Sequence, residues 1–392
     1  MTNLILFIFA FIGLANTEKP SVEVVSNQNK NASTPRFTTD ANNNPVLSWV
    51  ETDDGKSTLF FAVSKDGGQT FNDKIQVKAP TDFSTHAEGM PRIAFKANGE
   101  IWATFEMKAP TKEAPRAANL LFVASKDGGK TWSEATPVHK DMTPGKGHSF
   151  SDMIRLPNGE LGFTWLDEKM GNYDGRSVKF VQTLPAGGFS NEIVIDSNAC
   201  QCCRVVLFLD NSKNIHVTYR DLEKDNIRDM SHIVSKDGGK TFTIPSTVFN
   251  DGWKVAACPH TGPSMAELNN DFFVAWFSGK SATNEAGIRV AKIGDEKLIT
   301  SQLNIRAKHP QIVSDKKQLY LLWDESIPAG EQYLQSVALR KINEPEKTIY
   351  LSSNSESATY PVAFATSKGL IVAYEAQKSD GKQQIKVQLV KD

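Results

Sequence analysis

An eight-residue segment that occurs three times places the strongest constraint on how this chain can fold. It reads SKDGGQTF at 64–71, SKDGGKTW at 125–132 and SKDGGKTF at 235–242. In each copy an extended apolar run precedes the segment and a second extended run follows it. Asp-Gly-Gly supplies glycines for positive φ and a carboxylate that can accept N–H groups inside the turn. The segment therefore predicts a hairpin whose final aromatic side chain packs beneath it.

A second marker recurs along the whole chain: an apolar strand that ends in an aromatic residue, usually with an acid one or two positions later. The seven marker aromatics are Trp49, Phe105, Trp165, Tyr219, Trp276, Trp323 and Tyr374. The intervals between them run from 47 to 60 residues, which suits one four-stranded blade of a β-propeller. We therefore predict an all-β propeller of four-stranded antiparallel blades. The marker count favours seven blades; six blades, with one repeat outside the ring, is the alternative.

The two ends of the propeller are expected to meet. The last repeat ends at residues 385–390 with no sequence left for a fourth strand, and the strand at residues 21–26 has no partner of its own. We expect this N-terminal strand to complete the last blade and close the ring, because closure removes two exposed sheet edges. Residues 16–392 would then form a single propeller domain.

Residues 1–15 have the pattern of a signal peptide. The run LILFIFAFIGL at 4–14 is apolar, and the small residues Gly13 and Ala15 suit cleavage. No Lys or Arg precedes the run, so an uncleaved anchor is the alternative. We expect an exported protein, periplasmic or secreted, with no membrane span after cleavage. The charge balance, 44 Lys and Arg against 45 Asp and Glu, gives no reason to expect a nucleic-acid partner.

In a propeller the first strand of each blade lines the central channel, and the loops that lead into these strands (the channel loops) form one face of the disc. All four cysteines fall in two consecutive channel loops, those of the fourth and fifth repeats. Cys200, Cys202 and Cys203 lie in the first, and Cys258 lies in the second with His260 close behind. Soft sulfur donors and an imidazole suit copper(I) or zinc(II), so we expect these five residues to be metal ligands.

Disulfides are the alternative for the same cysteines. Four is an even number, and an exported protein works in an oxidising compartment. Cys203 and Cys258 could then clip the two loops together. Three further histidines in channel loops, His86, His148 and His309, are candidates to face the same channel mouth.

A second constellation consists of arginines. Arg36, Arg92 and Arg204 begin first strands, and Arg228 lies in the strand before the third eight-residue segment. Guanidinium groups that converge on a channel mouth bind a carboxylate through paired hydrogen bonds. The arginines therefore predict a site for a small acidic ligand.

The three repeated segments match the Asp box, and the chain from residue 16 onward resembles the sialidase-like, BNR-repeat β-propeller superfamily. Sialidases hold the sialate carboxylate with three arginines and use a Tyr nucleophile activated by Glu, together with an Asp acid/base. The resemblance implies Tyr360 as the nucleophile and Asp152 as the acid. The early Phe-Arg-Ile-Pro motif of sialidases is reduced here to Pro35-Arg36-Phe37.

The cysteine segments are foreign to that catalytic pattern and resemble a group of exported sialidase-like propellers with Cys-x-Cys-Cys and Cys-Pro-x-x-Gly-Pro segments. The sequence thus favours a propeller that binds a soft metal ion, copper or zinc, at the channel mouth. One alternative is an exo-α-sialidase-type glycoside hydrolase for sialic acid or a related acidic sugar. Another is a scaffold that binds a protein partner on the propeller face and has structural disulfides. Whether the protein is an enzyme is left open by the sequence.

Overall fold

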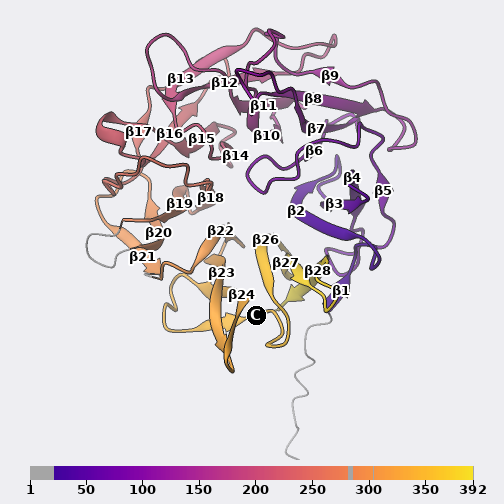
Figure 1. Cartoon of the computed structure of the whole chain (residues 1–392), viewed down its shortest axis with the longest axis vertical. Helices are drawn as coiled ribbons and strands as arrows, with labels where there is room; N and C mark the ends of the chain where they lie inside the picture. The colour runs from indigo at the N-terminus through magenta and orange to yellow at the C-terminus, as the bar shows by residue number, and fades with distance from the viewer. Residues whose placement is uncertain (1–21, 281–285, 303, 392) are drawn as a thin grey trace, which may run out of the picture.

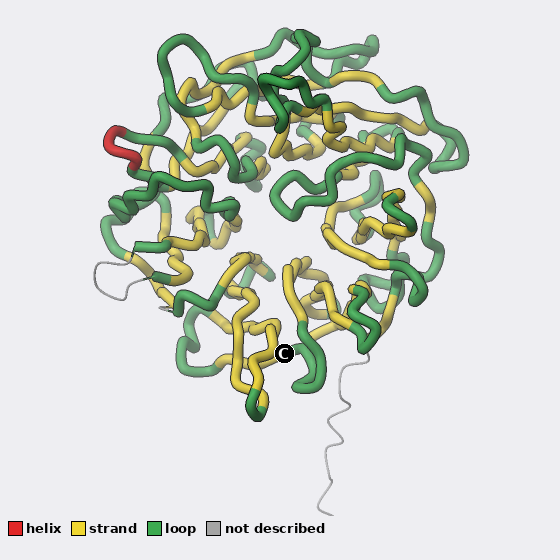
Figure 2. The backbone as a smooth tube through the Cα atoms, viewed as in Figure 1, coloured by secondary structure: helices red, strands yellow, loops and turns green. Residues whose placement is uncertain are grey.

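The structure is a computed structural model that describes residues 22–280, 286–302 and 304–391. Strands β1 to β28 form seven four-stranded antiparallel sheets arranged around a central axis (Figure 1, Figure 2). The predicted seven-bladed propeller is confirmed, and the six-bladed alternative is wrong. The predicted signal peptide at 1–15 lies outside the described residues.

The blades follow one another along the chain. Blades 1 and 2 contain β2 (Asn31–Thr39), β3 (Pro45–Asp53), β4 (Lys56–Val63) and β5 (Ile75–Gln76), then β6 (Arg92–Phe95), β7 (Ile101–Lys108), β8 (Ala118–Ser125) and β9 (Thr136–Pro137). Blades 3 and 4 contain β10 (Ser149–Arg155), β11 (Leu161–Leu166), β12 (Arg176–Gln182) and β13 (Ile193–Ala199), then β14 (Val206–Leu209), β15 (Ile215–Arg220), β16 (Met230–Ser235) and β17 (Ser246–Thr247). Blades 5 and 6 contain β18 (Ser264–Leu268), β19 (Asp271–Ser278), β20 (Gly287–Lys292) and β21 (Leu298–Gln302), then β22 (Lys308–Ser314), β23 (Leu319–Ala329), β24 (Gln332–Lys341) and β25 (Thr348–Tyr350).

Blade 7 contains β26 (Ala358–Thr366), β27 (Gly369–Gln377) and β28 (Gln383–Val390), and its fourth strand is β1 (Val22–Val24). Strand β1 pairs antiparallel with β28, with Val22 opposite Gln388. The N-terminal strand therefore closes the ring, as the sequence predicts, and covers an edge of β28 that would otherwise be open.

The seven marker aromatics form the centres of the blades. Each lies on the second strand of its blade and is at most 1% exposed. An acid two positions later accepts the indole N–H in two blades, from Trp49 to Glu51 at 3.0 Å and from Trp165 to Asp167 at 2.9 Å. A buried Trp is stable there because its ring is packed and its N–H has a partner.

The Asp boxes form the predicted turns and also attach neighbouring blades to each other. In the second box Asp127 accepts the Thr131 N–H at 2.9 Å and the Thr131 hydroxyl at 2.6 Å. These hydrogen bonds lower the pKa of Asp127 to about 2. Gly129 has φ +89°, and a Cβ there would lie 2.7 Å from Ile75 of blade 1. The box thus needs glycine both for its turn and for the contact with the preceding blade.

Four first strands carry a bulge at the channel mouth. The pairing register shifts there in β2, β10, β22 and β26. Each bulge holds a non-glycine residue with positive φ: Thr34 (56°), Phe150 (59°), His309 (51°) and Tyr360 (52°). Bulges re-aim side chains next to binding sites, and such backbone conformations persist only where the surroundings enforce them.

An acid on the preceding blade holds three of these bulges. The carboxylate directly after a marker aromatic accepts the backbone N–H of the bulge residue: Glu106 from Phe150, Asp324 from Tyr360 at 2.9 Å, and Glu375 from Thr34 at 2.8 Å. The acids of the sequence marker therefore have two tasks. Those two positions after the aromatic bond an indole inside the blade, and those one position after it shape the channel mouth of the next blade.

Helical structure in the described residues is limited to the 3₁₀ turn η1 (Lys224–Asn226). No helix that could span a membrane is found in the described part of the chain.

Candidate functional site

Three thiols form a buried cluster in the channel loop of blade 4. The sulfur of Cys200 lies 3.8 Å from that of Cys202 and 3.8 Å from that of Cys203. All three residues are at most 5% exposed, and all are free thiols. A disulfide needs a sulfur–sulfur distance of about 2.05 Å. The arrangement is therefore a set of three separate sulfur donors that face a common point.

The channel loop of blade 5 adds two exposed donors beside this cluster. The ligand atoms of Cys202, Cys258 and His260 lie within 4.8 Å of one another, as do those of Cys200, Cys202 and Cys203. Cys202 belongs to both triads. The structure thus brings together all five residues that the sequence suggests as metal ligands, across about 55 residues of chain.

A single carboxylate joins the two cysteine loops. Glu88, in the channel loop of blade 2, accepts the N–H of Arg204 at 3.0 Å and that of Gly262 at 2.7 Å. Its other oxygen pairs with the Arg204 guanidinium. Burial alone would raise the pKa of Glu88, but Arg204 and the two N–H groups hold it below its ordinary value. Because Arg204 follows Cys203 and Gly262 follows His260 closely, Glu88 fixes the separation of the two donor loops.

The electrostatics around the cluster favour thiolate at Cys200. Hydrogen bonds from the Cys202 and Cys203 thiols lower the pKa of Cys200, and the Arg228 guanidinium lowers it further. A nitrogen of Arg228 lies 2.9 Å from the Cys200 sulfur. Burial raises the pKa of Cys203 to about 12. Cys200 is therefore the thiol of the cluster that loses its proton first, and the thiolate is the form that binds metal.

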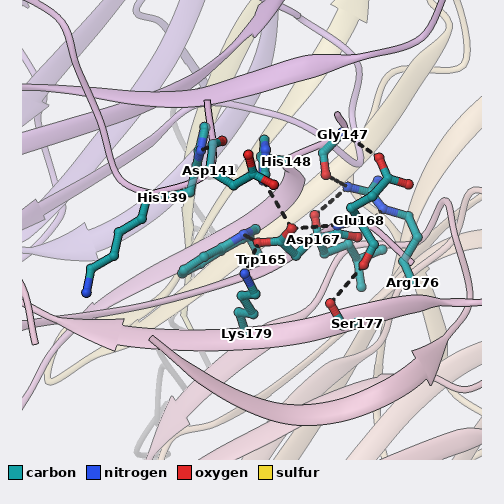
Figure 3. A network of polar contacts seen from close by, with 12 residues as sticks. His139, Asp141, Gly147, His148, Trp165, Asp167, Glu168, Arg176, Ser177 and Lys179 are labelled. Atoms are coloured by element: carbon teal, nitrogen blue, oxygen red, sulfur yellow. Dashed lines mark hydrogen bonds and ion pairs between the residues drawn. The ribbon is translucent and has the colours of Figure 1, made fainter. Parts of the chain in front are cut away.

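The cluster is covered on its inner side by the start of β10. Phe150 packs against the three buried cysteines. Arg176 on β12 holds this segment by donating to the Ser149 hydroxyl at 2.7 Å. It also donates to the Gly147 carbonyl (Figure 3). The guanidinium also lies 5.9 Å from the Phe150 ring centre. Phe150 therefore has a fixed position over the thiols.

The structure does not place His148 at the channel mouth, contrary to the sequence prediction. His148 is fully buried, stacks on His139 at 3.6 Å between ring centres and lies 3.3 Å from Asp167 (Figure 3). Lys179 and the Trp165 indole contact the same carboxylate. The bulge residue of this blade is Phe150, so the imidazole two positions earlier is left inside the blade's polar network.

Three of the four predicted arginines converge in the channel. Asp152 lies 3.0 Å from Arg92 and 3.7 Å from Arg36, and Arg204 pairs with Glu88. Burial and the charge of Arg92 lower the pKa of Arg36 to about 9. Arg92 is 3% exposed, and its two terminal nitrogens have no hydrogen-bond partner among the described residues. Arg228 is not part of this group, because it lies against Cys200 instead.

Tyr360 lines two cavities, and Asp152 lines neither of them. One has a volume of about 290 Å³ and is also lined by His86, Glu88, His260, Lys308 and His309. The other is smaller, about 20 Å³, and is also lined by Arg36, Arg204 and Glu375. His309 lies 2.7 Å from Asp324 through Nδ1, and its ring centre is 3.9 Å from that of Tyr360. Burial raises the pKa of Tyr360 to about 12. Asp152 lies with Arg36 and Arg92 around a separate cavity of about 170 Å³.

Sequence reasoning missed four acids that organise the mouth. Glu106, Asp324 and Glu375 directly follow marker aromatics, so their position in the repeat was a usable signal. Burial raises the pKa of Glu106 and of Glu375 to about 7. Glu88 stands in an irregular loop outside the repeat markers, and its role follows only from contacts with distant residues.

Comparison with known proteins gives a family and a set of similar folds. The model of the BNR repeat-like domain matches residues 74–373. No curated protein matches the chain. Similar solved structures include an ulvan lyase of a new polysaccharide lyase family, with TM-score 0.57, 10% identity and coverage of 92% of this chain and 94% of that one.

Two further solved structures share the fold. The polysaccharide lyase Uly1 has TM-score 0.55 and 11% identity, with coverage of 91% of this chain and 89% of that chain. A lectin from Burkholderia pseudomallei has TM-score 0.54 and 14% identity, with coverage of 92% of this chain and 96% of that chain. At such identities the similarity concerns the fold.

Proposed function

This chain belongs to the BNR repeat-like domain family, and we propose that it uses the channel mouth of its propeller to bind a soft metal ion, copper(I) or zinc(II). The protein is then an exported binding or delivery module. Cys200, Cys202, Cys203, Cys258 and His260 are the ligand residues.

The observation that supports this proposal is the spacing of the sulfur atoms. Two ligands bound at about 2.3 Å to one ion at the tetrahedral angle are about 3.8 Å apart. The Cys200 sulfur lies 3.8 Å from both of its neighbours. Two of the three sulfur pairs therefore already have the separation that a shared ion requires, and metal binding would remove the mutual repulsion of ionised thiols.

Copper(I) is the favoured ion. The buried donors are three sulfur atoms, and soft thiolates suit copper(I) as well as zinc. A structural zinc site takes four ligands in a tetrahedron. The buried cluster offers three, and the further donors Cys258 and His260 lie in the second triad with Cys202.

Metal analysis of the protein purified without oxygen tests the proposal. We expect copper or zinc to co-purify or to bind on addition, and free-thiol titration to detect the four cysteines only after the metal is removed. Cys203→Ser should lower the metal content, whereas Ser367→Cys, which adds a thiol in an exposed turn, should not raise it. A metal-free product with its cysteines in disulfides would overturn the proposal and favour the scaffold alternative.

A second candidate is a glycoside hydrolase for an acidic sugar, favoured by the arginines. Arg36, Arg92 and Arg204 converge, and Arg92 has two terminal nitrogens without a partner in the described residues. Tyr360 has a carboxylate nearby, since Thr359 pairs with Glu375 across β26 and β27. Two polysaccharide lyases and a lectin share this fold, and at their sequence identities the similarity concerns the architecture. Release of the fluorophore from a fluorogenic sialoside, abolished in Tyr360→Phe, would support this candidate.

A further inference from the structure

We infer that the channel mouth holds two metal ions rather than one, with the Cys202 sulfur shared between them. This inference rests on the proposed metal-binding function and specifies the site. The inner ion is bound by Cys200, Cys202 and Cys203. The outer ion is bound by Cys202, Cys258 and His260.

The separations of the ligand atoms limit what a single ion can reach. With metal–sulfur bonds of about 2.3 Å, two sulfurs on one ion are at most about 4.6 Å apart, when they stand on opposite sides of it. The five ligand atoms form two triads within 4.8 Å, and no larger group at this limit is found among the described residues. One ion at bonding distance from all five is therefore incompatible with the arrangement. Two ions, one in each triad, use every donor.

The position of Cys202 makes it the shared ligand. It is the one residue that belongs to both triads. It is grouped with the buried Cys200 and Cys203 in one and with the exposed Cys258 and His260 in the other. A thiolate sulfur has several lone pairs and can bind two soft ions at once. The two donor loops are held at a fixed separation by Glu88, which accepts hydrogen bonds from both.

The two ion positions differ in their surroundings. Cys200, Cys202 and Cys203 are buried, and Arg228 contacts Cys200, whereas Cys258 and His260 are exposed. The inner ion is covered by protein, and the outer ion lies at the surface, where it can be exchanged.

The test is an anaerobic titration of the reduced protein with copper(I) against a chromophoric copper(I) chelator. We expect two ions per chain. Cys258→Ser and His260→Ala should each retain one ion, because the buried triad stays intact. Cys202→Ser should lose tight binding of both, because each triad falls to two ligands. Ser367→Cys, with an added thiol far from the mouth, should still bind two. Thermal unfolding of each metal-free variant identifies any that fail to fold.

X-ray absorption separates the possible arrangements. The protein loaded with two ions should show a copper–copper scattering shell, and Cys258→Ser loaded with one should lack it. Two ions without that shell would overturn the sharing of Cys202. One ion in the unaltered protein would overturn the inference and leave the proposed function standing. Failure to bind either copper(I) or zinc(II), the latter titrated in the same way, would overturn the proposed function itself.

Discussion

The channel mouth has two halves, an arginine half and a thiol half, in which buried charges are neutralised in different ways. In the arginine half, Arg36 and Arg92 face Asp152, and Arg204 faces Glu88. Folding itself supplies the counter-charges there. In the thiol half, residues 200–203 and 258–260, sulfur atoms face one another, and one guanidinium contacts Cys200. The arginine half is complete once the chain has folded, whereas thiolates in the other half need an ion from outside.

Glu88 connects the halves. It pairs with Arg204 on one side and accepts the backbone N–H groups that flank the two cysteine loops on the other. A substitution of Glu88 should therefore affect both halves. Substitutions of residues that contact only one half should affect that half alone.

The largest effect is expected for Glu88→Ala. The substitution leaves two buried N–H groups without an acceptor and removes the carboxylate partner of the buried Arg204 guanidinium, which keeps only the Pro263 carbonyl. Removal of one partner from a buried ion pair costs about 3–5 kcal/mol of unfolding free energy. Copper(I) affinity should fall as well, because the two donor loops lose their common anchor. Urea unfolding and the chelator competition measure the two effects, with the exposed Glu113→Ala as the control. A stability loss with unchanged copper(I) affinity would show that the halves are independent.

Glu375→Gln should change how the free energy of unfolding depends on pH, and it should leave the thiol half unaffected. Burial raises the pKa of Glu375 from 4.5 to about 7. Between these values the folded protein holds a proton that the unfolded chain has released, so stability falls as pH rises through this window. At 1.36 kcal/mol per pKa unit, the wild type should lose up to about 3 kcal/mol relative to the variant from pH 4.5 to pH 8.

The glutamine keeps an oxygen that can accept the Thr34 N–H, so the bulge of β2 should survive in this variant. Urea unfolding at several pH values between 4.5 and 8 provides the comparison. Some pH dependence should remain in the variant, because burial also raises the pKa of Glu106 to about 7. Parallel curves for the two proteins would contradict a raised pKa at Glu375.

Arg228→Met should lower the metal affinity of the thiol half and leave the arginine half unaffected. The guanidinium favours thiolate at Cys200, and loss of such an outer partner lowers metal affinity about 10- to 100-fold. The loss should be greater at low pH, where protons compete with the metal for the thiolate. Chelator competition at two pH values measures this change, and the exposed Arg116→Met is the control. Equal affinity in both variants would mean that Arg228 only packs against the loop.

The smallest effect is expected from a matched glycine pair on the blades, away from both halves. A Cβ at Gly129 would lie 2.7 Å from Ile75, whereas one at Gly128 would meet nothing within 4 Å. Both have positive φ, so Gly129→Ala should unfold more easily than Gly128→Ala by about 1 kcal/mol, the added cost of overpacking. Copper(I) stoichiometry should be unchanged in both. A change in stoichiometry would link the boxes to the mouth.

Much of the fold could be predicted from the sequence because its signals are local. The Asp boxes encode turns within eight residues, and the marker aromatics repeat at blade intervals, so blade number and ring closure followed from counting. The same reasoning placed Cys200 and Cys258 in neighbouring loops. It put Arg228 in a strand with the other arginines and His148 at the mouth, but Arg228 lies before β16 and His148 lies before β10. A position in the repeat does not say which way a side chain outside the strands points.

What the sequence determined by itself is the architecture and the set of donor residues, because hairpin chemistry and strand periodicity act over short distances. The tertiary structure alone decided how those donors meet. Glu88 reaches residues 116 and 174 positions away, and Glu375 bonds a backbone 341 positions away. Such contacts depend on the closed ring, in which the first and last blades and the loops of blades 2, 4 and 5 face a single channel. The arrangement of sulfur atoms follows from that closure.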